Sequence, residues 1–268
     1  MGPSDNNGFR PETEVAVGAV QAGLQLALSR AGAGDIRSKG GRDLVTATDI
    51  AVEQAVRAVL GQAFDFPVVG EEAGGAPVPG APYWLVDPIC GTRNFASAIP
   101  VFAVNVALAE GDQVSLGAVG DGSSGGVYCA EHGKGAFSME DGAWQPVSTS
   151  AASRTVVIEG FPAAGPRRDG AARFLAEMVR ADNWDIRSFG STLSLAYLAT
   201  GKVAACVLFG APTLHVAAGV ALAREAGATV TDIGGRPWTT ASASLLAASE
   251  AKIAGELSAV ARATKALG

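Results

Sequence analysis

Short apolar runs between residues 66 and 119 constrain the fold of this chain more than any other feature of its sequence. The runs lie at 66–70, 83–87, 101–109 and 114–119, and Gly, Pro and acidic residues separate them. They are too short for typical helices and are rich in β-branched residues, which favours strands. We therefore expect a sheet of mainly antiparallel strands in the first half of the chain.

Two helices are expected before this sheet. Residues 12–31 place apolar side chains at helical spacing, and the pattern ends at Gly32 to Gly34. In residues 46–60, Thr46 stands three positions before Asp49, as in a capping box, and apolar residues follow on one stripe. The second helix would hold Asp49 in its first turn.

Helices and strands alternate in the second half of the chain. The patterns predict strands at 155–160, 186–190, 203–210 and 244–249, and helices at 169–180, 191–200, 212–227 and 251–267. No Pro/Gly/Ser-rich linker and no internal repeat interrupts this order. The prediction is one α/β unit over 1–268, with an α+β half at about 1–150 and an α/β half at 151–268.

Composition excludes several classes of partner. The net charge is -6, and the basic residues are scattered, so no face suits nucleic acid or an anionic membrane. No apolar run reaches the roughly 18 residues of a membrane span, and residues 1–10 do not resemble a signal peptide. A cytoplasmic location is therefore expected. The three cysteines are too few and too scattered for a disulfide framework, and Cys129 and Cys206 are predicted to be core thiols.

Three separated segments contain the residues best suited to chemistry: DLVTATD at 43–49, GEE at 70–72 and WLVDPICGTRNF at 84–95. Glu71 and Asp87 each end an apolar run, so two hard oxygen ligands would converge on a divalent cation, with the Ile89 carbonyl as a third. Gly91 and Thr92 would open a helix or turn whose free backbone N–H groups receive a phosphate oxygen.

These segments, together with RSFGS at 187–191 and HVAAGVALAREAG at 215–227, resemble the inositol monophosphatase superfamily over nearly the whole chain. That family contains Mg²⁺-dependent, lithium-sensitive phosphatases. The resemblance implies a layered αβαβα sandwich, hydrolysis of a small phosphorylated metabolite and a homodimer. It also implies a first Mg²⁺ site at Glu71, Asp87 and the Ile89 carbonyl, where Thr92 and Asp49 would orient and deprotonate the attacking water.

The chain departs from the family pattern at two positions. The family has Asp-Pro-Ile-Asp-Gly-Thr where this chain has Cys90 in place of the second Asp, and Trp-Asp where this chain has Leu214 and His215. In the family, the two replaced carboxylates and the one matching Asp87 enclose a second Mg²⁺. Because Mg²⁺ prefers oxygen ligands, a set of Asp87, Cys90 and His215 is not expected to bind it well.

Three interpretations of Cys90 and His215 stay open. The second site has changed to Zn²⁺, or Cys90 is a nucleophile of low pKa paired with His215, or both side chains fill space in a site with no second ion. The corresponding functions are a metal-assisted phosphatase with an altered second site, a repurposed cyclase, lyase or isomerase of small-molecule biosynthesis, and a catalytically inactive binding homologue.

The substrate pocket is predicted to be more apolar than that of an inositol phosphatase. Leu208 falls at the position where those enzymes place a hydroxyl-binding glutamate. Ser191, in the RSFGS segment, is assigned to the same pocket. The alternative is that Leu208 packs within its strand and a neighbouring residue lines the pocket.

Overall fold

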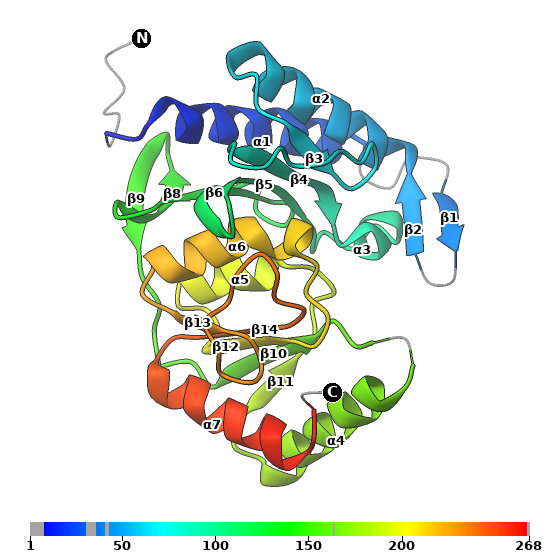
Figure 1. The fold of residues 1–268 in the computed structure, drawn as a ribbon, viewed down its shortest axis with the longest axis vertical. Coiled ribbons are helices and arrows are strands. Elements are labelled where there is room, and N and C mark those ends of the chain that lie inside the picture. The colour runs from blue at the N-terminus through cyan, green and yellow to red at the C-terminus, as the bar shows by residue number, and fades with distance from the viewer. Residues whose placement is uncertain (1–7, 31–35, 41–42, 163, 267–268) are drawn as a thin grey trace.

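The computed structural model describes residues 8–30, 36–40, 43–162 and 164–266, and within 36–45 it describes the backbone alone. Its elements form layers in the order helix, sheet, helix, sheet, helix (Figure 1). This is the αβαβα arrangement expected from the sequence. Among the described residues, none of the helices combines the length and the apolar character of a membrane span.

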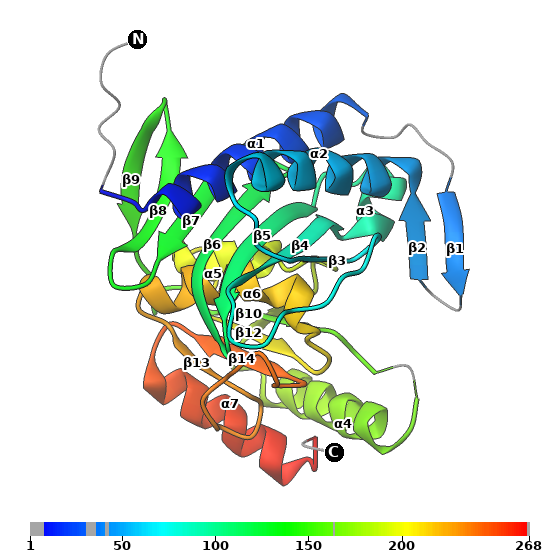
Figure 2. The same cartoon turned by 45° about the horizontal axis from the view of Figure 1, so that its top comes forward.

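The first half of the chain forms two long helices over a seven-stranded sheet. The helices α1 and α2 lie side by side on one face of that sheet (Figure 2). Only β3 and β4 pair in parallel, and all other neighbours are antiparallel. The elements are α1 (Pro11–Ser29), a hairpin of β1 (Ile36–Gly40) and β2 (Asp43–Thr46), α2 (Ala47–Ala63), β3 (Val68–Gly70), β4 (Tyr83–Cys90), α3 (Thr92–Ala96), β5 (Ala103–Glu110), β6 (Gln113–Asp121), β7 (Val127–Glu131), β8 (Gly135–Glu140) and β9 (Ala143–Val147).

The second half forms a smaller mixed sheet with helices on both faces. The strand order is β11-β10-β12-β14-β13, and β14 runs antiparallel to both of its neighbours. The helices α5 and α6 lie between the two sheets, whereas α4 and α7 cover the outer face (Figure 1). The elements are β10 (Thr155–Glu159), α4 (Pro166–Ala181), β11 (Asp185–Arg187), α5 (Leu193–Ala199), β12 (Ala205–Leu208), α6 (Thr213–Glu225), β13 (Thr229–Thr231), β14 (Leu245–Ala248) and α7 (Ala251–Ala263).

The large sheet is apolar on both faces because helices cover both. In β4, Trp84 and Val86 pack towards α1 and α2, whereas Leu85 between them packs into the core beside α5 and α6. Successive strand residues point to opposite faces, so burial on both sides produces a continuous apolar run rather than an alternating one. The run that predicted β4 from sequence reflects this double burial.

The sequence predictions for the helices and strands are largely confirmed. The expected helix 12–31 is α1, which ends at Ser29, and residue 31 lies outside the described residues. Thr46 and Asp49 form the predicted capping box, and the helix begins at Ala47. Strands β1, β2, β7, β8, β9 and β13 were not predicted. The division of the chain into two halves near residue 150 stays a prediction.

Helix α6 approaches the large sheet unusually closely. A Cβ added at Gly117 in β6 would lie 2.5 Å from the carbonyl oxygen of Ala218 in α6 and 2.8 Å from the Ala218 Cα. Both are backbone atoms, so relief would require the helix or the strand to move. The absence of a side chain at Gly117 therefore sets the distance between β6 and α6.

We expect Gly117→Ala to lower the free energy of unfolding by about 1–3 kcal/mol, because the added methyl overpacks this contact. The matched control is Gly18→Ala in α1, where an added Cβ meets no atom within 4 Å. That change should raise the free energy of unfolding by about 0.5–1 kcal/mol through helix propensity. Urea unfolding of both variants checks the opposite signs, and a Gly117→Ala variant as stable as the wild type would contradict the prediction.

Candidate active site and metal centre

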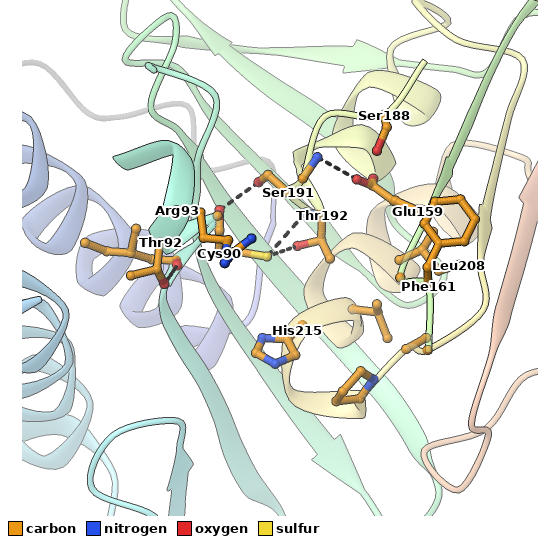
Figure 3. Close-up of a pocket in the computed structure, with 18 of the residues that line it drawn as sticks. Cys90, Thr92, Arg93, Glu159, Phe161, Ser188, Ser191, Thr192, Leu208 and His215 are labelled. Atoms are coloured by element: carbon orange, nitrogen blue, oxygen red, sulfur yellow. Dashed lines mark hydrogen bonds between the residues drawn. The ribbon is translucent and has the colours of Figure 1, made fainter. Parts of the chain in front are cut away.

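A cavity of about 470 Å³ lies where the end of β4 meets the loop before α5 and the first turn of α6 (Figure 3). Segments that are far apart in the sequence line it. They are Glu71, Ile89–Arg93, Glu159–Phe161, Ser188, Gly190–Thr192, Leu208, Gly210–Pro212, His215 and Val216. The cavity therefore brings together most of the residues predicted from sequence. Asp87 is fully buried near its wall, and Asp49 is connected to it through Thr92.

Thr92 and Asp49 form the predicted pair. Thr92 Oγ1 lies 3.1 Å from both Asp49 Oδ1 and the carbonyl oxygen of Ile89, and it can donate to either. The other carboxylate oxygen of Asp49 accepts hydrogen bonds from the Thr46 backbone N–H and hydroxyl of the capping box. Burial raises the pKa of Asp49, and the hydrogen bonds from Thr46 and Thr92 only partly oppose that shift. The helix cap thus fixes one oxygen of Asp49 and leaves the other facing Thr92.

Asp87 and Glu71 converge on His215. Asp87 Oδ2 lies 2.7 Å from His215 Nδ1, and Glu71 Oε2 lies 3.9 Å from the same nitrogen. Asp87 has no exposed surface, and none of the described residues forms a hydrogen bond with its second oxygen, Oδ1. A buried carboxylate oxygen without a partner is costly and therefore calls for a cation. Together with the Ile89 carbonyl, these carboxylates provide the hard oxygen donors that suit Mg²⁺.

Cys90 and His215 form a second group of possible ligands with Asp87. Asp87, Cys90 and His215 each offer one ligand atom, and these atoms all lie within 4.8 Å of one another. The thiol and imidazole do not suit Mg²⁺, which requires oxygen ligands in near-octahedral geometry. The residues present therefore fit Mg²⁺ at the first position and do not fit it at the second.

Cys90 is held by the loop before α5. Its Sγ accepts hydrogen bonds from the Thr192 hydroxyl at 2.9 Å and from the Thr192 backbone N–H at 3.3 Å, and its carbonyl oxygen accepts one from the Ser191 hydroxyl at 2.7 Å (Figure 3). Burial, followed by the charge of Asp87, raises the pKa of the Cys90 thiol well above its usual value. The low pKa that the nucleophile hypothesis requires is therefore not found, and the thiol is protonated at neutral pH.

Gly91 allows the chain to turn sharply between β4 and α3. Its φ of +104° lies in the region that favours glycine, and a Cβ there would lie 3.1 Å from both the Ser191 Cβ and the Val101 carbonyl oxygen. This close approach keeps Gly91 and Thr92 at the cavity wall. The predicted helix after Gly91 is confirmed as α3.

Leu208 and Phe161 form an apolar wall of the cavity, and Phe209 packs behind Phe161. Leu208 lines the cavity from the end of β12, as predicted, rather than only packing within its strand. Phe161 also lines the cavity and stacks on Phe209, with ring centroids 5.8 Å apart. Ser191 lines the cavity as well, although its hydroxyl is engaged with the Cys90 carbonyl.

Sequence reasoning missed Glu159. This glutamate ends β10 and lines the cavity, although it is nearly fully buried. Its carboxylate accepts a hydrogen bond from the Gly190 backbone N–H at 2.7 Å (Figure 3) and another from the Ser194 hydroxyl at 3.0 Å. It therefore fixes the loop that holds Cys90. An acidic residue at the end of an apolar strand, as at Glu71 and Asp87, was the signal that could have identified it.

The other cysteines and the DLVTATD segment complete the comparison with the predictions. Cys129 and Cys206 are buried in the core, as predicted. The side chains of 43–45, at the start of the segment, lie outside the described residues.

The fold and the site define a layered α/β protein with carboxylates gathered at the ends of its strands. Residues 10–265 match the model of the inositol monophosphatase family, and the chain belongs to that family. Members are generally metal-dependent, and the metal is usually Mg²⁺. The match supports a phosphatase of the inositol monophosphatase type.

Among curated relatives, the inositol-1-monophosphatase ImpA of Mycolicibacterium smegmatis is 36% identical over 222 residues, covering 78% of this chain and 77% of the relative. The histidinol-phosphatase of Mycobacterium tuberculosis is 35% identical over 221 residues, covering 79% and 83%. Among solved structures, the extragenic suppressor protein SuhB of Bartonella henselae has a TM-score of 0.85 and 27% identity, covering 94% of this chain and 99% of that one.

The raised pKa of Glu159 generates a prediction about stability and pH. Burial raises this pKa above the ordinary value of 4.5, so above that pH the unfolded chain releases a proton that the folded chain still holds. The contribution of Glu159 to the free energy of unfolding therefore falls as pH rises through this window. Relative to wild type, Glu159→Gln should become progressively more stable between about pH 4 and neutral pH.

Denaturant unfolding of wild type and Glu159→Gln at a series of pH values measures this difference. The control is Glu250→Gln at an exposed position, where the side chain stays in water in both states and no such trend is expected. A difference between wild type and Glu159→Gln that does not change with pH would contradict the assignment.

Proposed function

We propose that this protein hydrolyses a phosphate monoester of a small metabolite with the help of one Mg²⁺ held by Glu71, Asp87 and the Ile89 carbonyl. The observation that supports this most directly is the hydrogen bond between Thr92 Oγ1 and Asp49 Oδ1, 3.1 Å long, beside the converging carboxylates. A Mg²⁺ ion bound there would polarise a phosphoryl oxygen and lower the pKa of a bound water.

Thr92 and Asp49 would remove the proton of the attacking water. Thr92 Oγ1 accepts the proton from the water and passes its own proton to Asp49 Oδ1. Because burial raises the pKa of Asp49, this carboxylate is a stronger base than an exposed aspartate. The Thr46 donors on the other oxygen hold Asp49 in the orientation that this transfer needs.

Gly91 and Thr92 would bind the phosphoryl group through their backbone N–H groups. Both residues line the cavity at the start of α3, and Gly91 has no side chain that would keep a phosphate away. In this arrangement the phosphorus would lie between the water-activating pair and the apolar wall. The leaving group would then extend towards Leu208 and Phe161.

The apolar wall supports a leaving group with an apolar face, rather than a polyhydroxylated ring. Relatives of similar identity carry the names of different substrates, namely an inositol phosphate and histidinol phosphate. Overall identity therefore does not choose the substrate, and the pocket residues must. The homodimer and the cytoplasmic location stay predictions.

Removal of the Thr92 hydroxyl should disable catalysis without removing the metal ligands. We expect Thr92→Ala to lower kcat by about 10²–10⁴-fold, because proton transfer from the water is lost, whereas Thr92→Ser should retain most activity. The assay measures phosphate release in the presence of Mg²⁺ from a panel of phosphate monoesters of sugars, inositols and arylalkyl alcohols such as benzyl alcohol. The matched control is Thr264→Ala, whose hydroxyl bonds to Val260 at the end of α7.

Two results would contradict the proposal. One is wild-type kcat in Thr92→Ala, and the other is the absence of phosphate release from every monoester with Mg²⁺, Mn²⁺ or Zn²⁺.

The apolar wall should set the substrate preference. Benzyl phosphate and inositol 1-phosphate both release an alcohol, and we expect the benzyl ester to have the higher kcat/KM. Leu208→Ala should lower kcat/KM for benzyl phosphate by at least about 10-fold, because several apolar contacts are lost. The control is Val207→Ala, since Val207 packs on the opposite face of the same strand. A higher kcat/KM for inositol 1-phosphate in the wild type would contradict this prediction.

A further inference from the structure

The second metal position of this chain has a donor set of its own. Asp87 and Cys90 come from the end of β4, and His215 comes from the first turn of α6. Their ligand atoms lie within 4.8 Å of one another, and Cys90 and His215 both line the cavity (Figure 3). Three possible metal ligands are thus gathered at the wall of the cavity: one carboxylate oxygen, one sulfur and one imidazole nitrogen.

The chemistry of these donors distinguishes between cations. A thiolate and an imidazole are ligands for Zn²⁺ and similar transition metals, whereas Mg²⁺ and Ca²⁺ select oxygen. Catalytic zinc sites typically have three protein ligands and a fourth position open to water or substrate. Because two of the three side chains line the cavity, the fourth position here would face that cavity.

Two further observations indicate a cation. Asp87 has no exposed surface, and its Oδ1 has no hydrogen-bond partner within the described part of the chain. The Cys90 sulfur already accepts two hydrogen bonds from Thr192, which would stabilise negative charge on it when the proton is displaced by a metal. Thr192 is in turn held by Asn105, whose amide donates to the Thr192 hydroxyl at 3.2 Å.

We propose that Asp87, Cys90 and His215 form a three-ligand site for a thiophilic divalent cation, with Zn²⁺ as the best match, open on its fourth side to the cavity. This site goes beyond the proposed phosphatase function and does not depend on it. Ligand atoms around a tetrahedral zinc lie about 3.6 Å apart, given metal–ligand distances of about 2.0–2.3 Å. Binding would therefore draw the widest pair inwards and open the 2.7 Å contact between Asp87 and His215.

Cobalt(II) tests this proposal without any activity measurement. Co²⁺ commonly occupies zinc sites, and a coordinated thiolate gives an intense near-ultraviolet charge-transfer band. The metal-free full chain should develop this band on titration with Co²⁺, and Zn²⁺ should abolish it by displacement. Cys90→Ser should bind without the band. The control, Cys129→Ala, removes a thiol that is buried in β7 away from the cavity, and it should keep the band.

Two further variants distinguish the effect of the ligands themselves from the effect of Thr192, which donates hydrogen bonds to Cys90. Thr192→Val keeps all three ligands and removes the hydroxyl that donates to Cys90, so it should weaken Zn²⁺ binding by about 10–100-fold. The double variant Cys90→Asp with His215→Asp should exchange the preference, losing the band and gaining affinity for Mg²⁺. Equilibrium dialysis measures both effects, and circular dichroism verifies that each variant is folded.

The proposal is overturned if the folded wild-type chain binds Co²⁺ without a thiolate band, or if the band persists in Cys90→Ser. It is also overturned if Zn²⁺ affinity is the same in wild type and in the double variant. None of these results depends on phosphate release, so they stand apart from the Thr92→Ala test of the phosphatase function.

Discussion

The buried carboxylate of Asp87 is the constraint on which the rest of this site depends. It lies at the point where Pro88 interrupts β4 and the register with β5 shifts between Asp87 and Cys90. A carboxylate with no exposed surface is costly unless opposite charge or hydrogen-bond donors surround it. One oxygen of Asp87 meets His215 and the other has no partner among the described residues. This unpartnered oxygen at the end of β4 is the observation on which the proposed cation sites rest.

Small residues bring the partner of Asp87 within reach. His215 belongs to α6, a helix buried between the two sheets, and its backbone touches β6 at Gly117. On another side of the helix, a Cβ at Gly219 would lie 2.6 Å from the Leu195 Cβ of α5. Larger side chains at either glycine would push α6 away from the sheet or from α5 and move His215 with it. The packing of α6 in the central layer therefore determines where His215 lies relative to Asp87.

Much of the fold and part of the site could be predicted from the sequence, because those features are encoded locally. The capping box of Thr46 and Asp49 and the strands that end at Glu71 and Asp87 follow from short patterns. Strand β9 could not be predicted in this way, because its exposed residues show no apolar run. The two donors that Thr192 directs at Cys90 come from 102 residues away, so only the folded chain reveals them. The position of Glu159 at the end of an apolar strand was a local signal for the site, but its bond to Gly190, 31 residues away, appears only in the folded chain.

In the proposed second site, Cys90 and His215 take the positions to which the sequence resemblance assigns two carboxylates, and this difference affects the charge of the site as well as its ligand type. Compared with the family pattern that the resemblance gives, two negative charges are absent beside Asp87. The electrostatic attraction of the site for a second hard cation is therefore weaker. Burial keeps the Cys90 thiol protonated, as its raised pKa shows, until a metal displaces that proton. Negative charge at the second position would thus be created only on binding of a cation that sulfur can hold. The proposed first position has only oxygen donors, from Glu71, Asp87 and the Ile89 carbonyl, so under these proposals the two positions would prefer different metals.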